Sequence, residues 1–242
     1  MNPDIPVYYS IIFILLVFAV LFFIVRGVNF GLFRLDVLDV KRQKITIRLS
    51  LSLFTWLIIS EMLAFTGFFK DYSVQPPLVV FLYLPPIALI IYLLFNRKFE
   101  KLLMQLPPSW LVNVQSIRVI IELIFWGLFL NNIISKRLTF LGSNYDILIG
   151  LLAPLISYYC FNRKLTKYYA IIWNMLGLLF HLTFITTLFY SMPGSTRLFF
   201  DGPTNTLFGY FPFVWMPAFT SPFIIAMHLF SMKQLLKTKM PL

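Results

Sequence analysis

The chain has 242 residues, of which 60% are hydrophobic and 12% are charged. Ordinary soluble domains are about 25% charged, and the mean hydropathy of +0.84 leaves too little polar surface to cover a water-soluble globule. Lipid must therefore serve as much of the solvent. The net charge of +11 does not indicate nucleic-acid binding, because the basic residues form short clusters between apolar runs and no continuous basic face.

Seven apolar runs predict an all-α membrane protein, a bundle of seven transmembrane helices in a single domain over residues 1–242. One bilayer crossing needs about 20 mostly apolar residues. The runs cover residues 6–26, 48–69, 77–96, 107–130, 145–162, 168–190 and 211–232. No segment between them is long enough for a separate soluble domain. Pro154 predicts a bend in the fifth run.

Lysine and arginine predict the orientation of the bundle. The segments after the first, third, fifth and seventh runs carry most of them: Arg26, Arg34, Lys41, Arg42, Lys44, Arg48, Arg97, Lys98, Lys101, Arg163, Lys164, Lys167, Lys233, Lys237 and Lys239. The opposite segments carry Lys70, Lys136, Arg137 and Arg197. The positive-inside rule puts the first set in the cytoplasm. We therefore expect a multi-pass protein of the cell membrane with its N-terminus outside and its C-terminus in the cytoplasm.

Ionisable side chains inside the apolar runs are candidate site residues, because an unpaired charge in hydrocarbon costs several kcal/mol. At a rise of about 1.5 Å per residue, Glu61, Arg118, Glu122 and His181 share one layer in the outer half of the membrane. Arg118 and Glu122 are four residues apart, so they face the same side of their helix. They form either a self-neutralising ion pair or part of a ligand site.

Two further polar groups extend this layer. Asn174 lies two helical turns before His181, so both can face one groove, although an asparagine here also serves as a hydrogen bond between helices. Asn144 and Asp146 lie at the outer start of the fifth run. They form the rim of an outward pocket, or Ser143 and Asp146 form a variant capping box at the start of that helix.

His228 is predicted to lie apart from His181. Counted from the outer ends of their runs, the two imidazoles differ in depth by roughly 10–15 Å, too far for a shared metal. The same run carries Trp215, Pro217 and Pro222. Two prolines break the backbone hydrogen-bond ladder and leave carbonyls for Thr220, Ser221 or water to satisfy.

Three functions remain open. We favour the binding or transport of a small or lipid-like ligand through a polar pocket in the outer half, because four ionisable groups at one depth are costly. Its candidate ligand-binding residues are Arg118, Glu122, His181, Glu61, Asn174, Asp146, Asn144 and Trp215. The first alternative is a metal-dependent intramembrane hydrolase acting on lipids, with a metal held by Glu122, Glu61, His181 and Asp146. The second is a structural or assembly subunit of a membrane complex.

Membrane lipids are the expected partners, and no sequence motif identifies a cofactor. A retinal Schiff base is excluded, because no lysine lies between Phe211 and Met232. A nucleotide-binding glycine pattern is also absent from the sequence.

Overall fold

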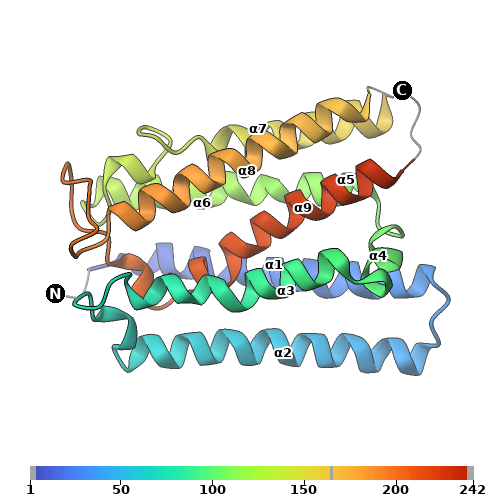
Figure 1. Cartoon of the computed structure of the whole chain (residues 1–242), viewed down its shortest axis with the longest axis horizontal. Helices are drawn as coiled ribbons and strands as arrows, with labels where there is room; N and C mark the ends of the chain where they lie inside the picture. The colour runs from blue at the N-terminus through green and yellow to red at the C-terminus, as the bar shows by residue number, and fades with distance from the viewer. Residues whose placement is uncertain (1–3, 164–165, 239–242) are drawn as a thin grey trace.

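The computed structural model describes residues 4–163 and 166–238. Within these two ranges the regular structure is helical throughout, and the long helices run alongside one another (Figure 1). Lys164 and Lys239, two of the basic residues that predict the orientation, lie outside the described residues.

The first four apolar runs fold as helices, with the first two longer than predicted. Helix α1 covers Val7–Arg34 and α2 covers Asp39–Phe65. The third run is a 3-10 helix, η2 (Leu78–Tyr83), that continues into α3 (Leu84–Phe95). A short helix, α4 (Arg97–Leu103), precedes the fourth run, which comprises α5 (Pro108–Asn113), η3 (Val114–Ser116) and α6 (Ile117–Leu130).

The last three runs also fold as helices, and the fifth and seventh contain π-helical turns. The fifth is α7 (Asp146–Ser157), which ends in the π-helical turn η5 (Tyr158–Asn162) a few residues after Pro154. The sixth is α8 (Lys167–Tyr190). The seventh begins at Met216, five residues later than the predicted 211, with the π-helical turn η7 (Met216–Thr220), and continues as α9 (Ser221–Lys237).

Five of these helical segments are long and apolar enough to cross a membrane: Val7–Arg34, Asp39–Phe65, Leu78–Phe95, Pro108–Leu130 and Lys167–Tyr190. The segment Asp146–Asn162 is apolar but shorter. The α9 segment does not meet the same criterion, and its polar residues and prolines account for this. The chain is therefore a membrane protein with five candidate spans.

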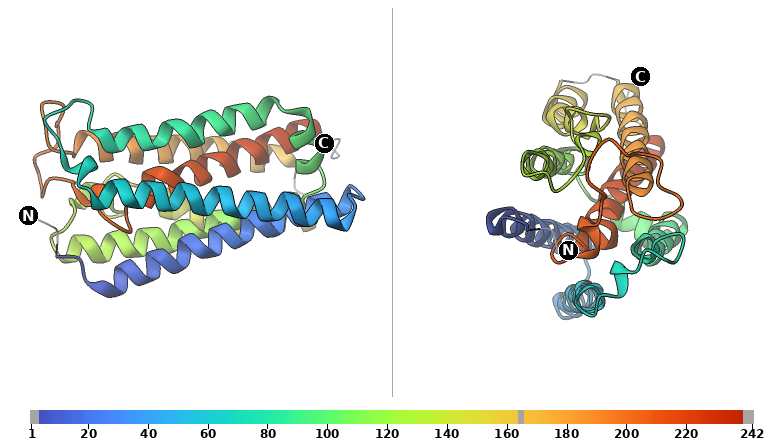
Figure 2. Two further views of the ribbon diagram at one scale, coloured as in Figure 1. Left: turned by 90° about the horizontal axis from the view of Figure 1, so that it is seen from below. Right: turned by 90° about the vertical axis from the view of Figure 1, so that its left-hand side faces the viewer.

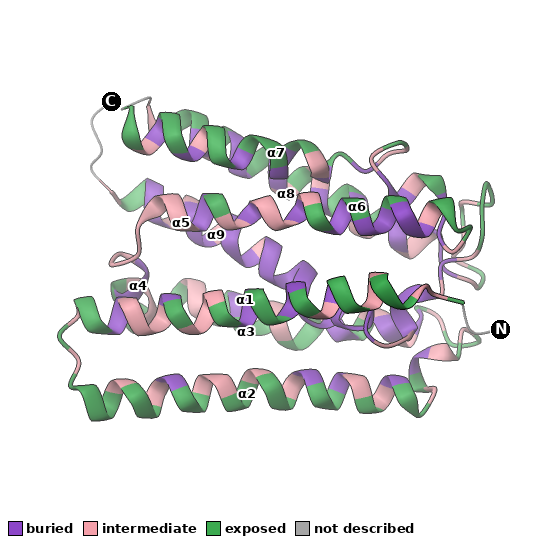
Figure 3. Cartoon of the chain, turned by 180° about the vertical axis from the view of Figure 1, so that it is seen from behind, coloured by how far each residue is buried: buried purple, intermediate pink, exposed green. Residues whose placement is uncertain are grey.

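The position of α9 explains how it accommodates its polar residues. It runs through the middle of the bundle, between α3 and α8, whereas α2 lies at the edge (Figures 1 and 2). All residues from 212 to 224 are buried. The outward face of α2 is exposed along its length (Figure 3), which suits a helix in contact with lipid. A helix enclosed by protein needs no apolar surface toward lipid, so its polar side chains can face neighbouring helices.

The prolines of this segment do free a backbone carbonyl, but its partner differs from the prediction. Pro222 has no N–H group to donate to the carbonyl of Ala218, four residues earlier. The indole Nε1–H of Trp56 in α2 donates to that carbonyl over 2.8 Å. Ser221 makes a different contact, described below. The proline break therefore ties α9 to α2.

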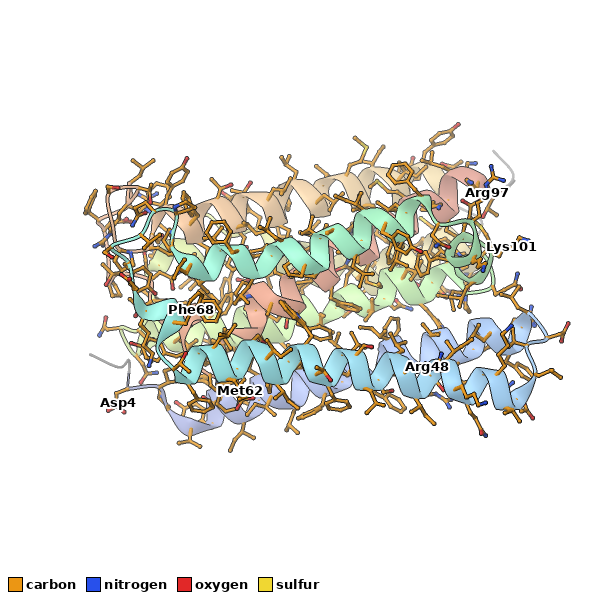
Figure 4. All side chains as sticks on the ribbon, turned by 60° about the horizontal axis from the view of Figure 1, so that its bottom comes forward. Asp4, Arg48, Met62, Phe68, Arg97 and Lys101 are labelled. Carbon is orange, nitrogen blue, oxygen red and sulfur yellow. The ribbon has the colours of Figure 1, made fainter. Side chains whose placement is uncertain are left out.

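The basic residues predicted to lie in a loop after the first run are mostly helical. The connection between α1 and α2 is residues 35–38, so Arg26, Arg34 and Arg48 lie on helices that extend beyond the apolar segments. Arg97 and Lys101 of α4 lie at the end of the bundle toward which the basic part of α2 points, whereas Asp4 lies at the other end (Figure 4). Helix α1 begins at the Asp4 end and α9 ends at the α4 end (Figure 1).

Candidate functional site

Nine polar side chains from α6, α7, α8, α9 and the segment before α7 form one hydrogen-bonded network, here called the polar cluster. Its members are Arg118, Glu122, Asn144, Asp146, Asn174, His181, Ser221, His228 and Ser231. All nine are buried. Buried polar groups of this kind are stable only when they satisfy one another.

Arg118 lies at the centre of the polar cluster and is 1% exposed. Its Nη2 donates to Asp146 Oδ1 over 2.8 Å and to the carbonyl of Gly177 over 3.1 Å. Its Nη1 donates to His228 Nε2 over 3.0 Å. One guanidinium therefore joins α6 to α7, α8 and α9. The planar fork of donors allows this, because it presents several N–H groups in fixed directions.

Asp146 joins this arginine to a histidine. Its second oxygen, Oδ2, lies 2.6 Å from His181 Nδ1, and His181 Nε2 lies 2.7 Å from Ser221 Oγ. An ionised carboxylate accepts hydrogen bonds and cannot donate them, so Nδ1 of His181 carries the proton. The pairing neutralises the charge of Arg118 within the bundle, as a buried charge requires.

His228 links Arg118 to Asn174 of α8 and, through Asn174, to Ser231 of α9. An arginine donates only, so His228 Nε2 must accept from Arg118, and the remaining proton is on Nδ1. That Nδ1–H donates to Asn174 Oδ1 over 2.8 Å. The amide nitrogen of Asn174 lies 3.0 Å from Ser231 Oγ and donates to the carbonyl of Ala170 over 2.7 Å. This histidine is therefore neutral.

Glu122 occupies the other end of the polar cluster. The Nδ2 of Asn144 donates to Glu122 Oε1 over 2.5 Å and to the carbonyl of Leu138 over 3.1 Å. Glu122 Oε2 is buried and has no hydrogen-bond partner within the described chain. The contact ties the loop before α7 to α6.

Six of the predicted site residues come together here, and two do not. Arg118, Glu122, Asn144, Asp146, Asn174 and His181 belong to the polar cluster. Glu61 is half-buried on α2, and no ion pair is formed by it among the described residues. Trp215 donates its indole N–H to the carbonyl of Leu57 over 3.1 Å and packs against Phe211. The predicted layer is therefore divided between two regions.

Two of the pairings that the sequence left open do not form. Arg118 pairs with Asp146 and not with Glu122, because the carboxylate at the start of α7 reaches both guanidinium and imidazole. The capping box of Ser143 and Asp146 does not form either. The Oδ1 of Asn144 accepts the backbone N–H of Asp146 over 3.1 Å, and Ser143 Oγ donates to the carbonyl of Arg137.

The predicted isolation of His228 is also wrong, because the helical segment that carries it begins five residues later than the sequence predicts. From Met216, His228 is twelve residues in, or about 18 Å at the usual rise. His181 is nine residues from the end of α8 at Tyr190, or about 14 Å. The side chain of Arg118 spans the small remaining difference. Ser221, His228 and Ser231 recur at intervals of seven and three residues, a helical-face pattern that was available in the sequence.

The chain Ser221–His181–Asp146 has the hydrogen-bond order of a nucleophile, base and acid. Two features favour a packing role for it. Asp146 is already paired with Arg118, which reduces its effect on His181. Ser221 is fully buried and does not line the pocket described next. The three side chains join α7, α8 and α9.

An apolar pocket of about 500 Å³ lies on the other side of α9. Its walls come from α1, α2, α3, η7 and α9, together with residues of α4 and α5. Apart from Ser52 and two tryptophans, its lining side chains are aliphatic, phenylalanine, methionine, proline or glycine. The volume falls within the range of about 300–1,000 Å³ that is usual for ligand pockets. Hydrocarbon is the chemistry that such a lining accepts.

Gly27 of α1 lines this pocket, and a Cβ at this position would meet no atom within 4 Å. The site therefore has room for a larger side chain that points into the pocket. Where α4 meets the end of α9, Lys233 Nζ lies 2.9 Å from Glu100 Oε2, and Lys237 also pairs with Glu100. The two ammonium groups, Lys237 foremost, lower the pKa of Glu100 to about 2. These ion pairs fix α4 against the end of α9.

Among residues 4–163 and 166–238, no group of three or more His, Cys, Asp or Glu side chains is arranged to hold a metal ion. We therefore assign no metal ligands. Comparison with known proteins gives no match to a protein-family model, to a curated protein or to a solved structure.

Proposed function

We propose that this membrane protein crosses the bilayer seven times, with its N-terminus outside, and binds a lipid-like ligand in the apolar pocket. The topology is supported by the basic bias and by the opposite positions of the start of α1 and the end of α9. Enclosure of α9 within the bundle makes a less apolar seventh span tolerable. In this orientation α4, and the part of the pocket that α4 lines, lie toward the cytoplasm.

The observation that carries ligand binding is the pocket itself. Its lining offers almost no hydrogen-bond donors or acceptors, so a hydrophilic solute would lose its hydration there without compensation. An acyl chain makes no hydrogen bonds to water, so it loses none on entering the pocket. The ligand-binding function expected from the sequence is therefore retained in its lipid-like form, at a different place in the bundle. The polar cluster holds α6, α7, α8 and α9 together beside it.

Thermal unfolding of delipidated protein in detergent tests this proposal. A ligand that binds only the folded state raises the melting temperature, and the stabilisation grows with the logarithm of the ratio of ligand concentration to Kd once that ratio exceeds one. We expect a long-chain lipid to stabilise the wild type and Gly27→Ala. We expect Gly27→Phe, which fills the pocket, to fold with little response to lipid. Equal lipid stabilisation of Gly27→Phe and Gly27→Ala would contradict the assignment of the pocket as the binding site.

A further inference from the structure

A second hollow adjoins the apolar pocket, on the side of α1 that faces α5, and is here called the α1–α5 groove. Its volume is about 570 Å³. Unlike the apolar pocket, it includes a charged side chain and an amide, Arg26 and Asn113, both of them exposed. The rest of its lining is apolar.

The groove and the pocket share a wall. Phe23 of α1 and Trp110 of α5 line both. Trp110 also packs against Phe30, one turn beyond Arg26, with ring centroids 4.9 Å apart. A molecule held at Arg26 therefore has the apolar pocket directly behind these two aromatic side chains.

Arg26 lies at the depth of lipid headgroups. It is nineteen residues from Val7, the first residue of α1, which corresponds to about 29 Å at the helical rise. The hydrocarbon core of a bilayer is about 30 Å thick. If α1 enters the hydrocarbon near Val7, Arg26 leaves it where the phosphates of the opposite leaflet begin, and the tryptophan beside it suits the same interface.

The charge of Arg26 is available to a ligand. Among the described residues no carboxylate lies within ion-pair distance of it, and its recorded contact is with the ring of its neighbour Phe22. A guanidinium fork matches the oxygens of a phosphate, and an asparagine amide adds two donors. The groove thus offers donors for an anionic group beside a pocket for hydrocarbon.

We propose that Arg26 and Asn113 bind the phosphate of an anionic phospholipid whose acyl chain occupies the apolar pocket. This inference rests on the proposed function and names its ligand class. It also supplies selectivity that the pocket lacks, because hydrocarbon gains little on moving from a bilayer into an apolar cavity. Discrimination among lipids then comes from the net charge of the headgroup, because a zwitterionic headgroup carries beside its phosphate a cation that the guanidinium repels.

Native mass spectrometry of the full chain in detergent tests this inference with phosphatidylglycerol and phosphatidylcholine of identical acyl chains. We expect the wild type to prefer the anionic lipid by about tenfold, the scale of one charge-assisted hydrogen bond. Arg26→Gln should reduce that preference to less than about twofold. Arg34→Gln removes the same charge from an exposed position eight residues along α1, outside the groove, and should keep the preference.

The variants separate the two proposals. Equal preferences in Arg26→Gln and Arg34→Gln, or an equal affinity of the wild type for both lipids, would overturn the headgroup site. If Gly27→Phe still loses binding of both lipids in that case, the lipid pocket stands without it. Binding that survives Gly27→Phe unchanged, or no binding of either lipid to the wild type, would overturn both.

Discussion

Arg118 shows how a single buried charge can organise four helices. Its guanidinium contacts the carboxylate of Asp146, the carbonyl of Gly177 and the imidazole of His228. Removing one partner of a buried ion pair leaves the other charge without compensation, which costs about 3–5 kcal/mol. This side chain therefore contributes more to stability than any exposed arginine.

We expect Arg118→Met to lower the free energy of unfolding by about 3–5 kcal/mol. The measurement is reversible unfolding in mixed detergent micelles, followed by circular dichroism. Arg34→Met is the matched control, because Arg34 is exposed at the end of α1, and should change the stability by less than about 0.5 kcal/mol. Similar losses in the two variants would show that the buried pairing adds no stability.

A separate experiment tests whether Arg118 is coupled more strongly to Asp146 or to Glu122. Double-mutant cycles report the coupling between two side chains. We expect Arg118→Met and Asp146→Leu to be coupled by about 1–3 kcal/mol, because the double variant removes both charges. Arg118→Met and Glu122→Leu should be coupled more weakly, since no hydrogen bond joins them. The reverse order of coupling would favour the pair of residues four apart on α6.

At this scale the sequence identifies the residue types and misses their pairing. Charges within apolar runs are conspicuous, so Arg118, Glu122 and His181 could be predicted as buried polar groups. Their partners depend on which helices are neighbours and on how far a side chain reaches. Asp146 is the second residue of its run, where the sequence is compatible with a helix cap or with the rim of a pocket, and its carboxylate accepts from both Arg118 and His181.

Between elements, the contact of α8 with α9 depends on a glycine. A Cβ built on Gly177 would overlap the ring of His228, whereas a Cβ on Gly27 would meet open space. Overpacking a well-packed interior costs about 1–3 kcal/mol. We expect Gly177→Ala to lower the free energy of unfolding by that amount and Gly27→Ala to leave it nearly unchanged. Equal changes in the free energy of unfolding for Gly177→Ala and Gly27→Ala would contradict this packing.

The contact of α4 with α9 is electrostatic and predicts a pH dependence. Glu100 has a folded-state pKa of about 2 against a model-peptide value of 4.5, because Lys237 and Lys233 stabilise its charge. A lowered folded pKa contributes stability above the unfolded value that is lost as the pH falls toward the folded value. We expect the melting temperature to decline between about pH 4.5 and pH 2.

Glu100→Gln provides the control for this pH dependence. It should melt lower than the wild type at neutral pH, and the difference should shrink on acidification and at high salt, which screens exposed pairs. A difference between the two proteins that is independent of pH would rule out this ion pair as its source.

Apolar length predicted which segments become helices, since each run is helical. It predicted ends less well. The basic continuations of α1 and α2 are helical because nothing in them breaks a helix. The last segment begins late, at Met216, because Pro212 interrupts the residues before it. Those five residues were enough to misplace His228 in depth.

For the molecule as a whole, the seven-span topology predicts where single cysteines react. Cys160 is the one cysteine of the sequence, so Cys160→Ser gives a cysteine-free background. Ser195 is exposed in the segment after α8, and Gln43 is exposed near the start of α2. The end of α8 and the start of α2 lie at opposite ends of the bundle (Figure 1). We expect a membrane-impermeant maleimide to label Ser195→Cys in intact cells, and Gln43→Cys only after permeabilisation. Labelling of both in intact cells would contradict the topology.

The bundle has two sides divided by α9, one polar and one apolar. The polar cluster faces α6, α7 and α8, and the apolar pocket faces α1, α2 and α3. The sequence could not predict this pocket, because its lining comes from segments far apart in the chain, each of which alone resembles an ordinary lipid-facing helix. The pocket forms because these segments lie side by side in the bundle. The depth of a residue along its own helix does not predict which helices are neighbours.

Photo-crosslinking with a phospholipid that carries a diazirine on its acyl chain tests the central proposal of a lipid pocket most directly. Phe223 and Met227 of α9 are buried, at 5% and 8% exposed, and both line the pocket. We predict adducts on these residues that Gly27→Phe abolishes, while adducts on exposed Met175 of α8 persist. Labelling confined to outward faces, with none on Phe223 or Met227, would contradict the proposal.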